Sequence, residues 1–332
     1  MWDAAKCDLC GDCLVKCLYV DYTREQAVAD IQALREGKPA AILSRCVTCC
    51  ACREYCPSGA DPFDLILRAM EARDAFPVSK ETVAMFDLAA TVPSTVIPGD
   101  PDKPALSLCL MEDRLPEGTV DSELFQGMTI AKGGDYFCSL GYVHLGLASP
   151  LGRNAGKFIA NLAALGKEIV FLHDDCYAMV HREVRDYGIE VPFRYKHLFE
   201  YLRDYLRDHR SRVRPLGLRV AYQRPCASRY TPEKDVFLDE IFELIGVEKP
   251  TRRYEGANAL CCSAAIIRVY PDMAVEVQAK NIDDAIAAGA EAIITLCPMC
   301  DRVLRRPAEA RGLGKIYVTD LCRIALGEKS FP

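Results

Sequence analysis

Eight cysteines near the start of the chain form two runs with the same spacing, C-x2-C-x2-C-x3-C, and Pro57 follows the second run. This spacing is typical of proteins with two iron–sulfur clusters: the first three thiolates of a run bind one cluster, and the fourth points away and binds the other. The sequence therefore predicts two [4Fe-4S] clusters with crossed ligands. One is held by Cys7, Cys10, Cys13 and Cys56, and the other by Cys46, Cys49, Cys52 and Cys17. Zinc also binds paired cysteines, but two matching runs of four favour iron–sulfur clusters.

A second set of cysteines lies at regular intervals in the last third of the chain. Cys226 ends the segment LRVAYQRPC, 34 residues separate it from the adjacent pair Cys261 and Cys262, and another 34 precede Cys297 and Cys300 in LCPMC. Adjacent thiols bridge each other only with strain, so we expect both to reach one iron–sulfur assembly from the same loop. The five thiols follow strand or loop segments and can converge on one rim of an open sheet, where such folds bind ligands.

The same intervals recur with fewer thiols between residues 105 and 215. The counterparts are Cys109, Phe137 with Cys138, and His173 with Cys176 in HDDC. Because ligand number decides cluster binding, we expect this half to have kept its fold and lost its cluster, the alternative being a cluster with His173 in place of one thiolate. His173, beside two aspartates, is also a candidate acid or base, since imidazole titrates near pH 7.

The elements that position these residues follow from the apolar pattern. Helical spacing of Ala27, Ile31 and Leu34, with Gly37 as a stop, predicts a helix between the two cysteine runs, and a second helix follows at 61–76, capped by Asp61. Four prolines in TVPSTVIPGDPDKP exclude a helix or a central strand there. Short apolar runs then alternate with helical segments, which predicts a mostly parallel sheet. The predicted strands are 105–111, 168–173, 218–223, 292–297 and 315–322.

This pattern predicts an α-helical ferredoxin domain plus an α/β domain built from two Rossmann-like halves. The expected divisions are an α-helical two-cluster domain at 1–92, a proline-rich linker at 93–104 and a cysteine-rich domain at 105–332. The last contains a degenerate first half, 105–215, and a cluster-binding second half, 216–332.

Composition narrows the class of protein further. The chain has 332 residues, 18 cysteines and a formal net charge of -6, which gives no basic footprint for nucleic acid. The longest uncharged stretch, residues 136–152, contains three glycines and a proline and is a poor membrane span. No signal peptide opens the chain, and so many cysteines in a reducing compartment indicate metal ligands or redox groups. We therefore expect a cytoplasmic protein.

The five-cysteine pattern, preceded by a helical two-cluster segment, resembles the heterodisulfide reductase family, with the catalytic subunit and its cluster-carrying partner joined in one chain. Similar proteins serve as iron–sulfur subunits of glycolate, lactate and glycerol-3-phosphate oxidising complexes and of anaerobic electron-transfer complexes. The resemblance covers nearly the whole chain. In that family the repeat ends CCG, whereas Ser263 follows the pair here, a change we expect to be tolerated unless the glycine needs a positive φ angle.

The resemblance implies one further [4Fe-4S] centre, cubane or noncubane, bound by the five thiols, with Cys261, Cys262 and His173 as candidate catalytic residues. Its ligands would be Cys226, Cys261, Cys262, Cys297 and Cys300. True disulfide reductases of the family have two such centres, so the incomplete first half is the main departure.

The expected function is that of a heterodisulfide reductase-like iron–sulfur subunit of an anaerobic redox complex. Electrons would pass through the two ferredoxin clusters to the cysteine-rich centre, which reduces a disulfide or another acceptor. The alternative is a pure electron-transfer adaptor, with no substrate of its own, between a flavin dehydrogenase or hydrogenase module and a final reductase. A zinc-stabilised scaffold without iron is a third class. Expected partners are flavoprotein or hydrogenase-type redox subunits; docking to a membrane subunit is compatible with the sequence, and nucleic acid is not expected.

Overall fold

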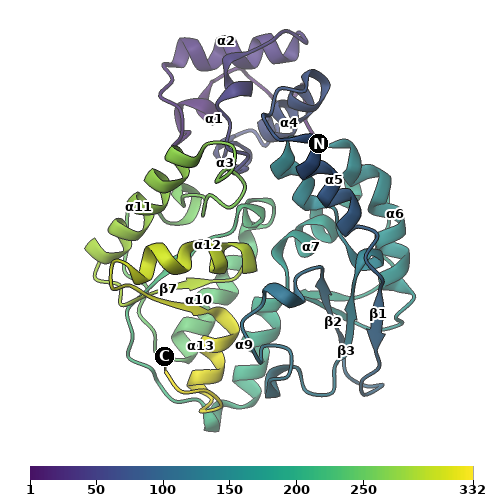
Figure 1. Cartoon of the computed structure of the whole chain (residues 1–332), viewed down its shortest axis with the longest axis vertical. Coiled ribbons are helices and arrows are strands. Elements are labelled where there is room, and N and C mark those ends of the chain that lie inside the picture. Colours follow the sequence, from purple (N-terminus) through teal and green to yellow (C-terminus); the bar gives the residue numbers. More distant parts are fainter. Residues whose placement is uncertain (332) are drawn as a thin grey trace.

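The computed structural model describes residues 1–331, and all secondary structure before residue 95 is helical. Figure 1 shows the helices up to residue 73 at one end of the molecule, above two α/β parts that lie side by side. The last helix before residue 95, at residues 80–89, lies against the first α/β part. The helices are α1 (Asp12–Val15), α2 (Arg24–Arg35), the 3-10 helix η1 (Ala41–Ser44), α3 (Ala51–Tyr55), α4 (Pro62–Arg73) and α5 (Lys80–Ala89).

The two long helices predicted in this part are present, and local signals explain their ends. Thr23 and Gln26 form a capping box at the start of α2, whose buried face consists of Ala27, Ile31 and Leu34 as predicted. At the start of α4 the Asp61 side chain accepts a hydrogen bond from the Asp64 N–H, and the helix begins with a proline.

The first α/β part contains a five-stranded sheet in the order β1-β3-β2-β4-β5. All neighbouring strands in it are parallel except β1, which pairs antiparallel with β3 at the edge. The strands are β1 (Thr95–Ile97), β2 (Ala105–Cys109), β3 (Thr129–Lys132), β4 (Ile169–Phe171) and β5 (Tyr195–His197). The main helices are α6 (Ser149–Ala163), α7 (Asp174–Ala178), the π-helix η6 (Met179–Glu183), α8 (Val184–Asp186) and α9 (Leu198–Asp208).

The proline-rich segment that leads into the first sheet passes close to a pair of glycines. A Cβ atom on Gly134 would lie 2.2 Å from the carbonyl oxygen of Ala90, and one on Gly133 would lie 2.5 Å from the carbonyl oxygen of Pro93. KGGD, residues 132–135, is thus a tight turn whose glycines leave room for the backbone of residues 90–94. The strand β1 follows that segment at the edge of the sheet.

The second α/β part contains three parallel strands in the order β6-β7-β8. These strands are β6 (Val220–Gln223), β7 (Ala292–Thr295) and β8 (Gly314–Tyr317), and the helices are α10 (Asp235–Leu244), α11 (Pro271–Ala287), α12 (Pro298–Glu309) and α13 (Val318–Ala325). The order β6-β7-β8 matches β2-β4-β5, and the isolated parallel bridge between Arg219 and Glu248 lies where β3 pairs in the first part. The predicted internal repeat is therefore visible in the strand pattern.

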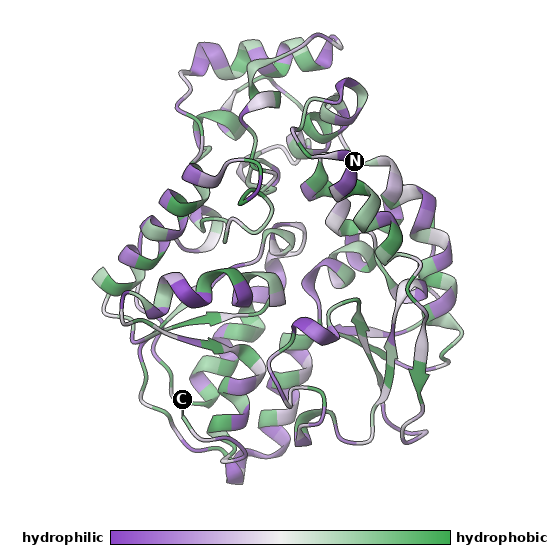
Figure 2. Cartoon of the chain, in the orientation of Figure 1, coloured by the Kyte–Doolittle hydropathy of each residue, from purple (hydrophilic) through white to green (hydrophobic). Residues whose placement is uncertain are grey.

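The two sheets share one hydrophobic core. Leu106 and Val170 of the first sheet belong to the same buried cluster as Val220 and Ile294 of the second, and α9 packs against α10 within it. Figure 2 shows hydrophobic residues concentrated along the strands, while the outer helices alternate between hydrophobic and hydrophilic residues. This shared core fixes the position of one sheet relative to the other, so the cysteines at the strand ends of both sheets lie close to one another.

All five predicted strands are observed, but the last is shorter than predicted: residues 315–317 belong to β8, whereas residues 318–322 form the start of α13. The strands β1, β3 and β5 were not predicted. Each of these three has only three or four residues, and β5 carries the polar sequence YKH. Among residues 1–331, no helix has the length and apolar character needed to cross a membrane.

Candidate iron–sulfur centres

The two four-cysteine runs have the same local backbone. Leu9 and Gly11 flank the second cysteine of the first run at φ 59° and 77°, and Thr48 and Cys50 occupy the same positions in the second run at 55° and 64°. The helices α1 and α3 begin directly afterwards. Cys50 therefore takes the place of a left-handed glycine, and its thiol, which is outside the ligand pattern, is buried.

The structure places Cys56 of the second run beside the first run. Burial and, next, the neighbouring thiols of Cys56, Cys10 and Cys7 raise the pKa of Cys13 to about 12. These residues are the first cysteine group, which consists of Cys7, Cys10, Cys13 and Cys56. Its members come together as the crossed assignment requires, and the ligand assignment itself stays a prediction.

The remaining four thiols of the two runs surround a small cavity. They form the second cysteine group, Cys17, Cys46, Cys49 and Cys52, and the cavity walls also include Ile42, Phe63 and Ile66. Burial is the main cause that raises the pKa of Cys49 to about 12. Cys50 also lines this cavity, but its thiol donates a hydrogen bond to the Thr48 carbonyl oxygen. The four thiols of the two runs form a donor set that suits a [4Fe-4S] cluster.

The five thiols of the second α/β part also converge, as the five-thiol group. The Sγ atoms of Cys226 and Cys261 are 3.6 Å apart. Hydrogen bonds between thiols link Cys261 to Cys262, Cys262 to Cys300 and Cys300 to Cys297. Hydrogen bonds from Cys226 and Cys262 hold the pKa of Cys261 well below its usual range. The loop after residue 259, the start of the 3-10 helix η8 (Cys226–Tyr230) and the start of α12 supply these ligands.

The residue after the adjacent pair has a left-handed backbone. Ser263 lies at φ 70°, and its N–H donates to Cys261 Sγ at 3.3 Å. The glycine position does require a positive φ, and serine adopts it here at a cost of about 1–2 kcal/mol. Ser139, which follows Cys138 in the first part, has φ 64°, so the repeat extends to this backbone detail.

Three thiols of the first α/β part meet as well. The Sγ atoms of Cys109, Cys138 and Cys176 all lie within 4.8 Å of one another, and all three side chains are buried. They form the thiol triad, supplied by the end of β2, the loop after β3 and α7. Hydrogen bonds from Cys138 and Cys176 hold the pKa of Cys109 well below its usual range.

His173 lies between the thiol triad and the five-thiol group. Its Nε2 is 3.9 Å from Cys297 Sγ and also 3.9 Å from an oxygen of Asp175. Burial alone would lower the pKa of His173, but Asp175 and the thiols of Cys109, Cys138 and Cys297 outweigh burial and raise it well above its usual range. The candidate acid or base is therefore in contact with thiols of both halves.

Two residues absent from the sequence predictions join the helical part to the five-thiol group. The Tyr19 hydroxyl accepts the N–H of Cys261 at 2.6 Å, and Cys49 and Cys261 belong to one buried cluster. Arg229, also buried, donates to Glu54, and Cys49 and Cys226 both act electrostatically on its guanidinium. Tyr19 follows Cys17 by two residues, but nothing in the local sequence indicates which loop its hydroxyl contacts.

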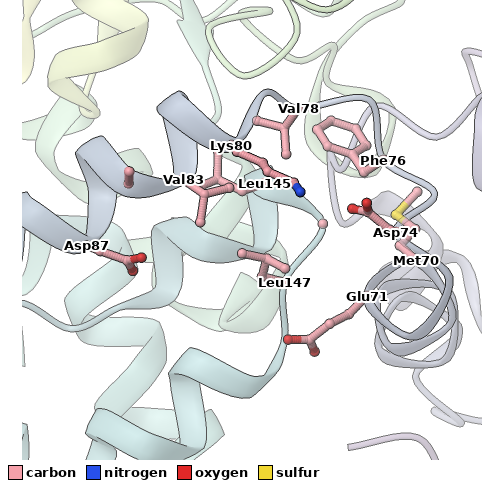
Figure 3. A pocket seen from close by; sticks show the side chains of 12 residues that line it. Met70, Glu71, Asp74, Phe76, Val78, Lys80, Val83, Asp87, Leu145 and Leu147 are labelled. Carbon is pink, nitrogen blue, oxygen red and sulfur yellow. The ribbon is translucent and has the colours of Figure 1, made fainter.

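A surface cavity of about 290 Å³ lies between α4, α5 and the 3-10 helix η5 (Leu140–Leu145). Figure 3 shows the carboxylates of Glu71, Asp74 and Asp87 and the Lys80 ammonium group among its lining side chains. None of its lining residues is a cysteine or a histidine. This cavity is therefore separate from the thiol chemistry.

Residues 220–305 match the family model described as a cysteine-rich domain, CCG. This segment is similar to CCG domains. The matched range includes all members of the five-thiol group, from the end of β6 into α12. An aligned segment of 157 residues is 24% identical to a protein from Methanothermobacter marburgensis that is named as one of the subunits of fumarate reductase (CoM/CoB). The aligned segment covers 45% of this chain and only 30% of that protein, so this chain is similar to only a part of the relative.

The fold as a whole is similar to a crystal structure of a hypothetical protein from Helicobacter pylori. The TM-score is 0.58 at 12% sequence identity, over 90% of this chain and 64% of that chain. This likeness concerns the fold alone.

Proposed function

We propose that this chain is a heterodisulfide reductase-like iron–sulfur subunit that relays electrons from its helical part to its CCG domain. Residues 1–92 would be the two-cluster ferredoxin domain, 93–104 the linker and 105–332 the cysteine-rich domain with two Rossmann-like halves. The CCG match, the thiol-rich sites and the similarity to part of a reductase subunit support an iron–sulfur protein of this kind.

One observation carries the proposed direction of the relay. Tyr19 is two residues from Cys17 of the second cysteine group, and its hydroxyl accepts the N–H of Cys261 in the five-thiol group. A path of covalent bonds and one hydrogen bond thus joins the second cysteine group to the five-thiol group. Both cysteine groups include partly buried thiols. Electrons would enter at the first cysteine group, because the second is the one joined to the five-thiol group.

The three proposed iron–sulfur sites would together supply one-electron steps between a donor and an acceptor. The thiols at each site suit the cluster proposed there. Each cysteine group of the helical part offers four thiols, and the CCG domain offers five. Arg229 lies between the last two sites as a buried positive charge. Such a charge favours added negative charge, so it would stabilise the reduced state of both.

At the CCG centre, Cys261 and Cys262 would hold the group that meets the acceptor, and His173 would hold a proton beside Cys297. A thiolate-rich site suits a disulfide or thiol substrate, because disulfides react by exchange with thiolates. Flavoprotein or hydrogenase-type subunits are the proposed partners. The adaptor remains the second candidate, since the first half has three of the five thiols.

Iron and acid-labile sulfide per chain, measured on anaerobically purified protein, test this proposal together with low-temperature EPR on stepwise reduction. We expect about twelve irons, the sum of three four-iron centres. We also expect sequential reduction, with the CCG centre distinct from the other two. A chain with zinc and no iron would be a scaffold. A chain with about eight irons would lack the CCG centre and contradict the relay.

A further inference from the structure

Helix α5 leaves an apolar face uncovered. None of its ten residues is buried, and Met85 and Leu88 are 54% and 69% exposed. The chain continues through Val92 into the edge strand β1, where Val96 and Ile97 are also exposed. Single exposed hydrophobic side chains are ordinary, but a group of them on one part of a surface marks an interaction site.

The surface cavity between α4, α5 and η5 borders this face. Ala84 of α5 lines the cavity, and Leu88 follows Ala84 by one helical turn on the same side of the helix. Figure 3 shows Val83, Leu145 and Leu147 among the apolar side chains that line the cavity. The cavity and the exposed side chains of Met85 and Leu88 thus form one surface, the α5 groove.

The size of the cavity favours an inserted side chain over an enclosed small molecule. Its volume of about 290 Å³ is at the lower limit for pockets that hold small molecules and cofactors, about 300–1,000 Å³, which enclose most of the ligand. Asp74, Lys80 and Asp87 line the cavity and are exposed to solvent. The groove is therefore open along its length, as a site for a segment of another protein would be.

The charges at the groove determine which segment it suits. Glu71 is compensated, because its carboxylate accepts the N–H groups of Ala148 and Ser149 at the start of α6. The carboxylates of Asp74 and Asp87 and the ammonium group of Lys80 also line the cavity.

Glu81 adds a further negative charge on the apolar face of α5. It is exposed, and it precedes Met85 by one helical turn and Leu88 by two. Negative charge thus exceeds positive charge at the groove. The whole chain has a formal net charge of -6, so a second copy would bring like charge to this surface.

We propose that the α5 groove binds a basic amphipathic helix of a partner protein. One apolar side chain of that helix would enter the cavity, others would cover Met85 and Leu88, and lysine or arginine side chains would meet Asp74, Glu81 and Asp87. Helix-in-groove recognition uses apolar anchors one and two turns apart, and opposite charges at the rim speed association.

The groove lies beside the helical part that contains the first cysteine group. Met70 and Phe76, which line the cavity, belong to the same buried cluster as Cys13. A partner in the groove would therefore be placed near the first cysteine group. That this partner supplies electrons rests on the proposed function, whereas the binding of a basic helix does not.

The test uses a fluorescent synthetic peptide with leucines along one helical face and lysines on the other. In its control peptide, glutamates replace the lysines. Fluorescence anisotropy with the full chain, purified anaerobically, should show saturable binding of the lysine peptide that weakens as salt is added. The glutamate peptide should bind at least about tenfold more weakly. Equal affinities for the two peptides, or no binding of either, would overturn the proposal, whatever the iron content of the chain.

Variants locate the binding site. Ala84→Arg places a long cationic side chain in the groove and should weaken binding of the lysine peptide at least about tenfold. Ala287→Arg adds the same side chain at an exposed alanine of α11 and should change the affinity by less than about twofold. Asp74→Asn, which suits the left-handed backbone at φ 49°, should reduce the salt dependence.

Two results would assign the groove differently. Equal affinities in Ala84→Arg and Ala287→Arg would place the peptide elsewhere and overturn the proposal. So would an unaltered chain that sediments as a dimer and an Ala84→Arg variant that sediments as a monomer, because a second copy would then occupy the groove.

Discussion

The first and second halves of the α/β region share a strand order but differ in their thiols. In the second half, five sulfurs form a chain of contacts that extends from Cys226 to Cys297. In the first half, three sulfurs gather within 4.8 Å. The common scaffold decides where thiols meet, at the strand ends. The two halves therefore place different numbers of thiols at corresponding strand ends, five in the second half and three in the first.

The halves also contact the helical part through different chemistry. The first half places Glu183 against Arg53, which also pairs with Asp61. The second half places Arg224 and Arg229 against Glu54. At the first half, the positive charge of the contact belongs to Arg53 of the helical part. At the second half, it belongs to Arg224 and Arg229, which lie next to the five-thiol group.

The largest expected difference between the halves is in iron content. Cys262→Ser removes a member of the five-thiol group, so the chain should lose about four of about twelve irons. The corresponding change in the first half, Cys138→Ser, should leave iron unchanged. Iron analysis and EPR of the helical clusters measure both effects. Equal iron loss in the two variants would mean that thiols of both halves bind iron.

One pH effect is expected at the contact of the first half with the helical part. Burial, opposed by Arg53, raises the pKa of Glu183 from 4.5 to about 7. Between these values the folded chain binds a proton that the unfolded chain has released, so the free energy of unfolding falls as pH rises. The decrease should be on the order of 3 kcal/mol across the window.

Glu183→Gln should remove this decrease, so Tm should change more favourably from pH 5 to pH 7 than it does in the unaltered chain. Both chains keep an opposite slope from His197, because burial lowers its pKa to about 4 and the unfolded chain then binds the extra proton. Glu243→Gln, a change at an exposed carboxylate of α10, is the control and should leave the pH dependence of the unaltered chain intact. The same Tm difference between pH 5 and pH 7 in Glu183→Gln and in the unaltered chain would assign the titration to another group.

A smaller effect is expected from the tyrosine that joins the helical part to the second half. Tyr19→Phe leaves the buried N–H of Cys261 without its acceptor, at a cost of about 1–3 kcal/mol in the free energy of unfolding. It should also slow reduction of the CCG centre in rapid-mixing experiments. Tyr142→Phe is the matched change in the first half, where the lost hydrogen bond goes to Asp87, an exposed carboxylate. Similar reduction rates in both variants would remove Tyr19 from the electron route.

The smallest expected effect compares the two left-handed serines. Ser263 has a buried Oγ without a partner in residues 1–331, whereas Ser139 Oγ accepts a hydrogen bond from Asn154 at 2.9 Å. Ser263→Gly should therefore raise the free energy of unfolding by about 1 kcal/mol, and Ser139→Gly should change it little. Thermal unfolding of both variants, with iron content as a check, measures this difference. Equal shifts would mean that the Asn154 hydrogen bond contributes nothing.

Features set by neighbours in sequence were predictable. The buried face of α2, the Asp61 cap of α4 and the five apolar strands follow from residue type and spacing over a few positions. The short strands β1, β3 and β5 were missed, because three or four residues carry too little periodicity to identify a strand.

The sequence by itself determined which residues could bind metal, because ligand runs such as C-x2-C place thiols within one turn of backbone. Only the tertiary structure decided how closely the thiols of the first half meet and which residues join one group to another. Parallel strands bring their carboxyl ends to one edge of a sheet, so Cys109, Cys138 and Cys176 converge although 67 positions separate the first from the last. In the same way, Tyr19 reaches Cys261 across 242 positions. Contacts of this kind depend on how whole elements pack together, and no local pattern encodes them.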